Sequence, residues 1–249
     1  MRLRGTVLAA ALLAASPVFA QSVGAQSGGT SVRAMLAPVN EAVLAGELAA
    51  RIEALPFQNG ERFKKGDTLV SFDCAAYRAA LAEARASLKA ADQSVANVRE
   101  LARLKSAGQL ELQLAESEVE KQRARVDSAR VPVDRCVIRA PFSGRVVERR
   151  AQPHESVPPG QPLLAILDDS QIEVRMVAPS GWLKWLKPGV TFGLKVDETG
   201  LTYNGKVTRL GARIDAVSQS VAVVGLLDKH SEGVIAGMSG SATFTPPPQ

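Results

Sequence analysis

Aromatic residues are scarce in this sequence, and so are cysteine and histidine, the residues that metal and nucleophilic sites often use. Phe, Trp and Tyr make up 4% of the 249 residues, and the chain has two cysteines and two histidines. Two cysteines are too few for a disulfide-stapled scaffold or for a CxxC-type zinc site. So few rings predict a thin or elongated body built from small aliphatic residues rather than a thick aromatic core.

Motifs of enzymatic chemistry are also missing. The chain has no P-loop, no G-x-S-x-G phrase and no H-E-x-x-H phrase. His154 and His230 have no third ligand nearby in the sequence, and the methionines at 35, 176 and 238 are isolated. We therefore expect no enzyme activity, no cofactor and no metal centre.

Both tryptophans stand in one short phrase, Gly-Trp-Leu-Lys-Trp-Leu, as Trp182 and Trp185. The phrase fits a packed loop or a short helix. An anchor at an interface is the alternative interpretation.

Long apolar runs are absent apart from a short one near the N-terminus. Arg2 and Arg4 precede the run Val7 to Ala15, and Val18-Phe19-Ala20 places small residues at positions −3 and −1 of a cleavage site. This pattern predicts a secretory signal peptide over residues 1–20, because a bilayer span needs about 20 apolar residues. An uncleaved anchor is the alternative. No cysteine follows the cleavage site, so we do not expect a lipoprotein.

Charge and hydrophobicity describe an exported, folded chain. Hydrophobic residues make up 46% of the sequence, which is ordinary for a globular protein. Without residues 1–20, 28 Lys and Arg face 25 Asp and Glu, and the two signs are interspersed. We expect a solvated surface of mixed charge in the periplasm, and no nucleic-acid partner.

Two long segments without glycine, on either side of Gly108, carry heptad patterns. Small or apolar residues recur at alternating steps of four and three, which is typical of helices that pack along a seam. The first seam is Tyr77, Leu81, Ala84, Leu88, Ala91, Val95, Val98 and Ala102, and the second is Leu112, Ala115, Val119, Gln122, Val126, Ala129 and Val133. The pattern predicts an antiparallel coiled-coil hairpin over residues 74–135, with two helices of an ordinary bundle as the alternative. We expect Gly108 to take the left-handed cap conformation and Pro132 to end the second helix.

The two cysteines fit this hairpin. Cys74 lies 31 residues before residue 105 and Cys136 lies 31 residues after it, which places both at the same height at the base of the hairpin. An oxidising compartment allows a disulfide between them. Two separate buried thiols are the alternative, because equal height does not ensure the spacing that a bridge needs.

The segments that flank the hairpin repeat each other weakly at an offset of 94 residues. Residues 61–70 align with residues 155–164, and Arg51-Ile52 aligns with Arg145-Val146. Each copy predicts a short strand, a glycine turn and a second strand. Two such pieces around a long insertion indicate two halves of one small β domain.

The C-terminal third consists of short alternating segments between turn signals. Strands are predicted at 172–177, 191–196, 205–210, 221–227 and 240–244. Pro188-Gly189, Thr199-Gly200 and Asn204-Gly205 are among the turns that separate them. This spacing argues for a small antiparallel barrel or sandwich.

Several of these phrases resemble one protein family. The phrase Ile138-Arg139-Ala140-Pro141-Phe142-Ser143-Gly144-Arg145-Val146, the phrase Gly60 to Asp67 and the barrel phrase Gly237-Met238-Ser239-Gly240 are similar to those of periplasmic adaptors. These proteins, also called membrane fusion proteins, serve tripartite efflux pumps and include HlyD-like secretion proteins.

The resemblance implies a mainly β fold with an inserted helical coiled-coil hairpin, a split biotinyl/lipoyl-like domain and a small antiparallel β-barrel. The implied domains are the two lipoyl-like halves at 32–73 and 136–169, the hairpin at 74–135 and the barrel at 170–246. Helical spacing within residues 42–55 favours a helix, whereas the resemblance implies strands around Gly46, and we follow the resemblance.

The resemblance also implies a function for the hairpin tip, which in the family contacts an outer-membrane channel. The candidate partner-binding residues are Arg99, Arg103, Leu104, Lys105, Ser106, Ala107, Gly108, Gln109, Leu110 and Glu111. Glu111 stands where the family pattern has Ser. This departure from the pattern argues against recognition of the usual channel. A simple solvated turn is the alternative.

We therefore expect a periplasmic adaptor that links an inner-membrane transporter to an outer-membrane channel for efflux. An RND-type transporter is favoured and an ABC-type transporter is the other option. The family implies a ring of six copies. The alternative function is a non-transport periplasmic scaffold or regulatory protein with the same fold.

Overall fold

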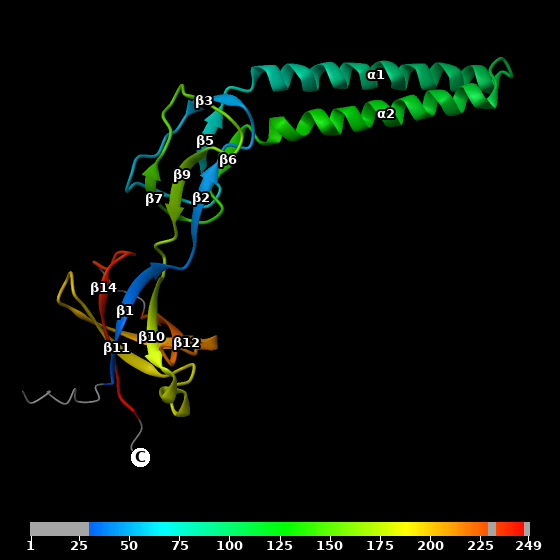
Figure 1. Cartoon of the computed structure of the whole chain (residues 1–249). Coiled ribbons are helices and arrows are strands. Elements are labelled where there is room, and N and C mark those ends of the chain that lie inside the picture. The colour runs from blue at the N-terminus through cyan, green and yellow to red at the C-terminus, as the bar shows by residue number, and fades with distance from the viewer. Residues whose placement is uncertain (1–29, 229–232, 247–249) are drawn as a thin grey trace, which may run out of the picture.

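The structure is a computed structural model, and it describes residues 30–228 and 233–246. The predicted signal peptide at 1–20 and His230 lie outside these residues. The described chain forms a β-barrel, a second β module and a pair of long helices that extends sideways from that module (Figure 1). Within the described part, no helix is both long and apolar enough to cross a membrane.

The barrel consists of six antiparallel strands in the closed order β1-β10-β13-β12-β11-β14. Inward residues alternate along the strands, so Leu36, Val174, Leu194 and Phe244 are almost fully buried in one core. The expectation of a small antiparallel barrel is confirmed. The strands are β1 (Ser31–Pro38), β10 (Ile172–Pro179), β11 (Thr191–Val196), β12 (Thr202–Asp215), β13 (Ser220–Leu227) and β14 (Ser239–Phe244).

Strand β1 corrects one of the expected boundaries. We placed residues 32–73 together in the first lipoyl-like half, but β1 closes the barrel by pairing with β10 and β14. Ala34 pairs with Met176 on one side and with Gly240 on the other. The physical reason is that the apolar face of β1, with Ala34 and Leu36, completes the barrel core.

The second β module, here named the split module, comprises β2 to β9. It has two four-stranded sheets, β2-β9-β7-β4 and β6-β5-β3-β8. Each sheet takes strands from both sides of the helix pair, so neither half is complete without the other. The strands are β2 (Glu41–Ala45), β3 (Ala50–Ala54), β4 (Arg62–Phe63), β5 (Thr68–Phe72), β6 (Val137–Arg139), β7 (Gly144–Arg149), β8 (Ser156–Val157) and β9 (Pro162–Leu167).

The offset of 94 residues recurs throughout the split module. β3, β4 and β5 begin at residues 50, 62 and 68, and β7, β8 and β9 begin at 144, 156 and 162. The turn bonds repeat as well: the Gly66 N–H donates to the Ala140 carbonyl at 2.9 Å, and the Gly160 N–H donates to the Gly46 carbonyl at 2.7 Å. The module is therefore two copies of one structural unit that close on each other.

Residues 42–55 form strands, as the resemblance implied, and not the helix that their spacing suggested. The Gly46 N–H donates to the Gln161 carbonyl at 3.0 Å, which ties the bend between β2 and β3 to the other half of the module. Leu48, Ile52 and Leu55 are buried in the core of the module. Tertiary packing against residues more than 90 positions away overrides the local periodicity.

The two helices are α1 (Ala75–Arg103) and α2 (Gln109–Asp134), joined by a short turn at their far end (Figure 1). All fifteen predicted seam positions are buried or half-buried, whereas almost all other positions of the two helices are exposed. At about 1.5 Å per residue, the 29 residues of α1 span about 44 Å. We refer to α1 and α2 as the helix pair.

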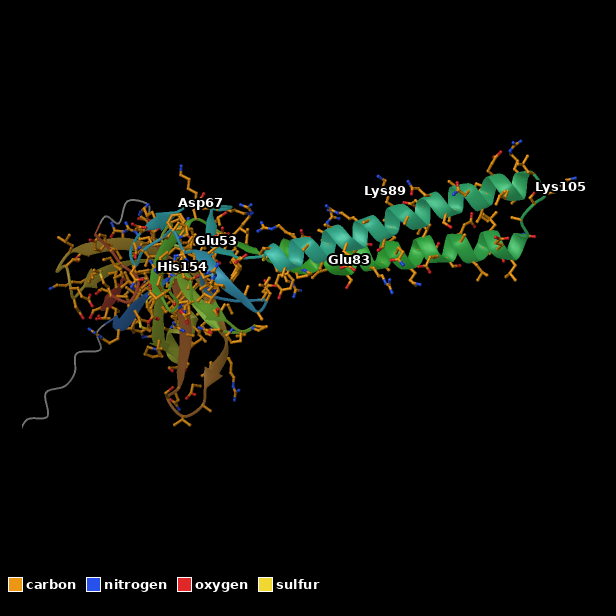
Figure 2. All side chains as sticks on the ribbon, turned by 90° about the horizontal axis from the view of Figure 1, so that it is seen from above. Glu53, Asp67, Glu83, Lys89, Lys105 and His154 are labelled. Carbon is orange, nitrogen blue, oxygen red and sulfur yellow. A yellow bond between two sulfur atoms is a disulfide. The ribbon has the colours of Figure 1, made fainter. Side chains whose placement is uncertain are left out.

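The end of α2 differs slightly from expectation. Pro132 lies inside the helix, which continues to Asp134. Proline removes one backbone donor but does not prevent two further residues from keeping helical geometry in a last turn. Seen from above, the helix pair projects as one thin arm from the compact β modules (Figure 2).

Candidate functional site

The tip of the helix pair is shaped by a left-handed residue at the end of α1. Lys105 has a φ of 58°. Its N–H donates to the Ala102 carbonyl at 3.0 Å, and the Ser106 N–H donates to the Leu101 carbonyl at 2.8 Å. This pair of bonds is the Schellman arrangement that ends many helices. Figure 2 shows Lys105 at the extreme end of the arm.

Gly108, which we expected to be the left-handed cap, has another role. Its φ of −82° and ψ of 157° are extended, and it stands as the N-cap of α2. Its carbonyl accepts the Leu112 N–H at 3.2 Å. The left-handed turn therefore comes three residues earlier, at Lys105, because α1 ends before Ser106 rather than after it.

Both candidate arginines have carboxylate partners within the helix pair. Arg99 Nη2 lies 2.8 Å from Glu116 Oε1, an ion pair that joins α1 to α2. Arg103 donates from Nε and Nη2 to Glu100 one turn earlier, with a shortest distance of 2.7 Å. This hydrogen bond lowers the pKa of Glu100 and raises the pKa of Arg103. Within the described chain, Lys105 and Glu111 have no ion-pair partner.

Four leucines are exposed around the tip. Leu104 and Leu110 are 57% and 68% exposed, and both belong to the predicted tip residues. Leu101 and Leu114, at 44% and 63%, flank them on α1 and α2 and were not among our candidates. The signal that identifies them is their apolar character at positions outside the two heptad seams. Four exposed leucines at the end of an isolated arm favour contact with another protein.

The base of the helix pair is fixed to the split module by several different contacts. Cys74 and Cys136 form a disulfide with a Cα–Cα distance of 6.1 Å, and both residues are buried. Tyr77 Oη donates to the Ala49 carbonyl at 3.0 Å. Arg135 Nε lies 3.1 Å from Glu47 Oε2. The loop between β2 and β3 therefore holds the first turn of α1 and the C-terminal end of α2.

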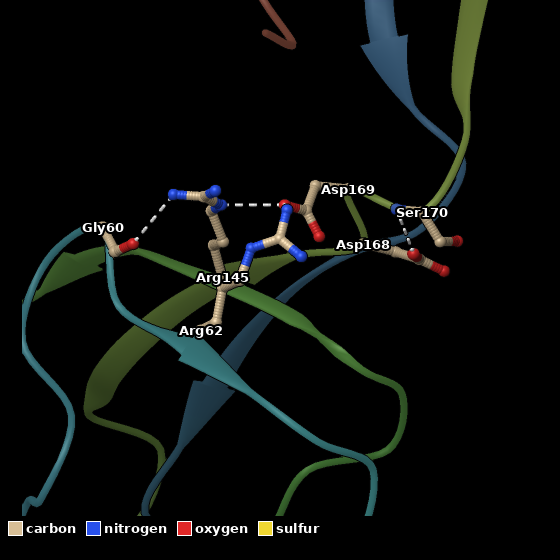
Figure 3. Close-up of polar contacts among 6 residues, drawn as sticks. All are labelled: Gly60, Arg62, Arg145, Asp168, Asp169 and Ser170. Atoms are coloured by element: carbon tan, nitrogen blue, oxygen red, sulfur yellow. Dashed lines mark hydrogen bonds and ion pairs between the residues drawn. The ribbon is translucent and has the colours of Figure 1, made fainter. Parts of the chain in front are cut away.

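The junction between the barrel and the split module is the third part of the site. The chain crosses it twice, after β1 and after β9, and the two crossings are joined to each other. The Asp168 N–H donates to the Asn40 carbonyl at 2.9 Å, and Asn40 Nδ2 donates to Asp168 Oδ2 at 3.1 Å. The Ser170 N–H donates to Asp168 Oδ1 at 3.0 Å (Figure 3).

Asp169 attaches this crossing to the split module. Its Oδ2 accepts from Arg62 Nη2 at 2.7 Å and from Arg145 Nε at 2.8 Å, and Arg145 also donates to the Gly60 carbonyl (Figure 3). A Cβ at Gly144 would overlap the carbonyl oxygen of Leu167. Only glycine lets β7 approach the crossing closely enough for Arg145 to reach Asp169.

No family model matches the chain. The nodulation protein NolF of Rhizobium meliloti is 26% identical over 217 residues, which are 81% of this chain and 59% of NolF. An uncharacterized protein of Haemophilus influenzae is 25% identical over 206 residues, 82% of this chain and 54% of its own. The chain thus spans less than two thirds of the length of these relatives.

Solved structures are more decisive for the fold. A MacA-MexA chimera that contains the Pseudomonas aeruginosa MexA α-hairpin domain has a TM-score of 0.76 at 17% identity, over 87% of this chain and 80% of the chimera. The membrane fusion protein Spr0693 of Streptococcus pneumoniae has a TM-score of 0.75 at 15% identity, over 88% of this chain and 99% of Spr0693. The chain has the membrane fusion protein fold. The resemblance drawn from the sequence is confirmed.

The membrane fusion protein fold explains what the Ile138–Val146 phrase does here. Arg139 Nη1 donates to the Gly66 carbonyl at 3.2 Å, and Ser143 Oγ accepts the Lys65 N–H at 2.9 Å. With Gly144 and Arg145 at the junction, the phrase connects the two halves of the split module to each other and to the barrel crossing. The residues of this phrase therefore have a structural role. Separately, among the described residues no group of three or more His, Cys, Asp or Glu side chains could hold a metal ion.

Proposed function

We propose that this protein is a periplasmic adaptor that links an inner-membrane transporter to an outer-membrane channel for efflux. The β modules associate with the transporter, RND-type in preference to ABC-type, and the helix pair reaches toward the channel. Six copies form a ring in which the arms stand side by side as coiled-coil hairpins. The predicted export signal supports the periplasmic location.

The observation that carries the proposal is the isolated arm with an apolar end. An arm of about 44 Å has no counterpart helix in the described chain to pack against, and its seam already buries the apolar residues that hold it together. The exposed leucines at the tip therefore do not serve the fold of one chain. They suit a contact made at a distance from the β modules, which is what an adaptor needs.

The test uses one change at two places on the arm. Leu110→Glu puts a charge on the exposed tip, and Val131→Glu puts the same charge on an exposed position of α2 near the base. We expect Leu110→Glu to abolish efflux of toxic compounds in cells with normal protein levels, and Val131→Glu to leave efflux unchanged. Equal export by both variants would count against a role for the tip.

Crosslinking in cells separates the adaptor from the scaffold alternative. An adaptor that carries a photoreactive group at Lys105 should capture an outer-membrane channel, and one with the group on the barrel should capture a polytopic transporter. Capture of neither, in cells that export normally, would favour the scaffold role.

A further inference from the structure

The Trp182 phrase is the part of the chain that the adaptor role leaves without a purpose. It forms the short helix η1 (Ser180–Lys184) and the turn after it, at the end of β10. Trp182 and Trp185 lie with their ring centroids 5.3 Å apart, and both pack on Phe244 at 5.7 and 6.1 Å. The rings therefore pack on the core of the barrel, and only the smaller part of their surface stays exposed.

This helix occupies the end of the barrel that lies farthest from the split module. Pro38 pairs with Ile172 at the end next to the crossings, whereas Ser31 pairs with Thr243 at the opposite end. η1 follows Pro179 at that opposite end, where β1 begins and β14 stops (Figure 1). Thr30, the first described residue, accepts from the Phe244 N–H at 2.9 Å and so lies at this same end.

The chemistry of this surface is that of an interfacial anchor. Lys184 and Lys187 are exposed between and beside the rings, and neither has an ion-pair partner in the described chain. From Val174 to Val196 the sequence has four basic residues and no acidic one. Within the part of the chain that the structure describes, neither indole N–H makes a hydrogen bond. Indole rings with a free N–H beside lysines are typical of the headgroup level of a bilayer.

We propose that Trp182, Leu183 and Trp185, with Lys184 and Lys187, bind an anionic membrane surface. The two rings and Leu183 enter the boundary between headgroups and acyl chains, the indole N–H groups donate to lipid oxygens, and the lysines meet phosphate groups. The barrel is then seated end-on against the lipid, with the helix pair held away from it. This contact does not depend on the adaptor role, because it needs only lipid.

The test uses the only two tryptophans of the chain, which both lie in this surface, as its reporter. The purified protein is mixed with vesicles of phosphatidylethanolamine and phosphatidylglycerol, or of phosphatidylcholine alone, and a brominated lipid serves as quencher. We expect a blue shift and quenching of tryptophan emission with the anionic vesicles only, and reversal by high salt because the attraction is electrostatic.

Charge variants show whether this surface makes the contact. K184E/K187E should weaken binding to the anionic vesicles at least about tenfold. K64E/K65E reverses another exposed lysine pair, on the split module, and should bind like the unchanged protein. Thermal melting of both variants checks that the barrel is intact.

Three outcomes would overturn the proposal. One is the absence of any spectral change with anionic vesicles, which would leave the tryptophans as a plug for the barrel end. Another is equal weakening by the two lysine pairs. The third is a spectral change that appears only when a transporter protein is added, which would assign the surface to a protein partner. None of these outcomes bears on the tip, so the adaptor role is tested separately.

Discussion

Cys74 and Cys136 lie 62 residues apart in the chain and are joined by a disulfide directly beneath the helix pair. Cys74 is the N-cap of α1, and Cys136 follows Arg135, the C-cap of α2. The bridge thus closes the helix pair into a loop at the point where both helices leave the split module. The bridge therefore acts with the Tyr77–Ala49 and Arg135–Glu47 contacts to hold the arm on the split module.

We expect loss of this bridge to lower stability by up to about 4 kcal/mol, the chain-entropy value for a loop of this length. Cys74→Ser/Cys136→Ser should melt at a lower temperature than the oxidised protein, and reductant should lower the melting temperature of the unchanged protein to a similar value. Peptide mass spectrometry without reduction locates the bridge. Two free thiols in protein from the periplasm would contradict it.

His154 stands where the repeat of the split module has Gly60. The His154 N–H donates to the Ile52 carbonyl and the Gly60 N–H donates to the Val146 carbonyl, both at 2.8 Å, and φ is 69° and 83° at the two residues. A residue with a Cβ destabilises the folded state by about 1–2 kcal/mol in this left-handed region. Glycine avoids this strain, but its more flexible unfolded chain loses more entropy on folding, which offsets part of the gain. We expect His154→Gly to raise the free energy of unfolding by about 0.5–1 kcal/mol.

Two further variants isolate the backbone effect. His154→Ala removes the ring but keeps the Cβ, so it should be less stable than His154→Gly. Gly60→Ala should destabilise by about 1 kcal/mol through its φ alone, because an added Cβ meets nothing within 4 Å. Chemical denaturation of the three variants measures their free energies of unfolding. A His154→Gly variant that is less stable than His154→Ala would contradict the prediction.

Asp169 should set the angle between the barrel and the split module. Asp169→Asn removes the charge that Arg62 and Arg145 share, and we expect broader distance distributions between spin labels placed at Glu53 and Lys195. Global stability should change by less than about 1 kcal/mol, since both arginines are largely exposed. Asp197→Asn, which removes the partner of Arg33 within the barrel, is the matched control and should leave the distribution narrow. Equal distributions for both variants would exclude a hinge role for Asp169.

Gln122 is the one polar residue of the two seams, and it is 7% exposed. Its amide lies among polar side chains of its own helix: Nε2 donates to Glu118 Oε1 at 2.5 Å, and Oε1 accepts from Arg125 at 3.3 Å. Gln122→Leu should stabilise the helix pair by about 1 kcal/mol through apolar burial. It should also relax the register, which a polar seam residue helps to fix. Helical circular dichroism on heating measures the first effect, with exposed Gln113→Leu as the control; a lower midpoint for Gln122→Leu would be contrary to expectation.

The seam positions could be predicted from sequence because helical periodicity is local. Every residue from Tyr77 to Ala102 that the pattern selected is buried or half-buried, and the same holds from Leu112 to Val133. The repeat of 94 residues likewise survives as strands that start at matching positions. In both cases neighbours in sequence carry the signal.

Three features could not be predicted from the sequence, each for its own reason. The place of β1 in the barrel requires Ala34 to meet Met176, and nothing near Ala34 announces that partner. Lys105 rather than Gly108 takes the left-handed turn because the last bonds of α1 close at Leu101 and Ala102. Leu114 was missed because it lies outside the seam. At such positions the heptad pattern does not distinguish an exposed leucine from an ordinary surface residue.

The closure of the barrel also affects the order in which the modules can fold. β1 and β14 are hydrogen-bonded neighbours, although nearly the whole described chain lies between them. The modules are nested along the sequence: the helix pair is inserted into the split module, and the split module is inserted between β1 and β10 of the barrel. A chain delivered N-terminus first can therefore finish its innermost part early. β1 can then pair with β10, but it lacks its second neighbour, β14, until residue 239 has emerged. A chain that ends before residue 239 should give a protease-resistant split module and arm beside an open, digestible barrel.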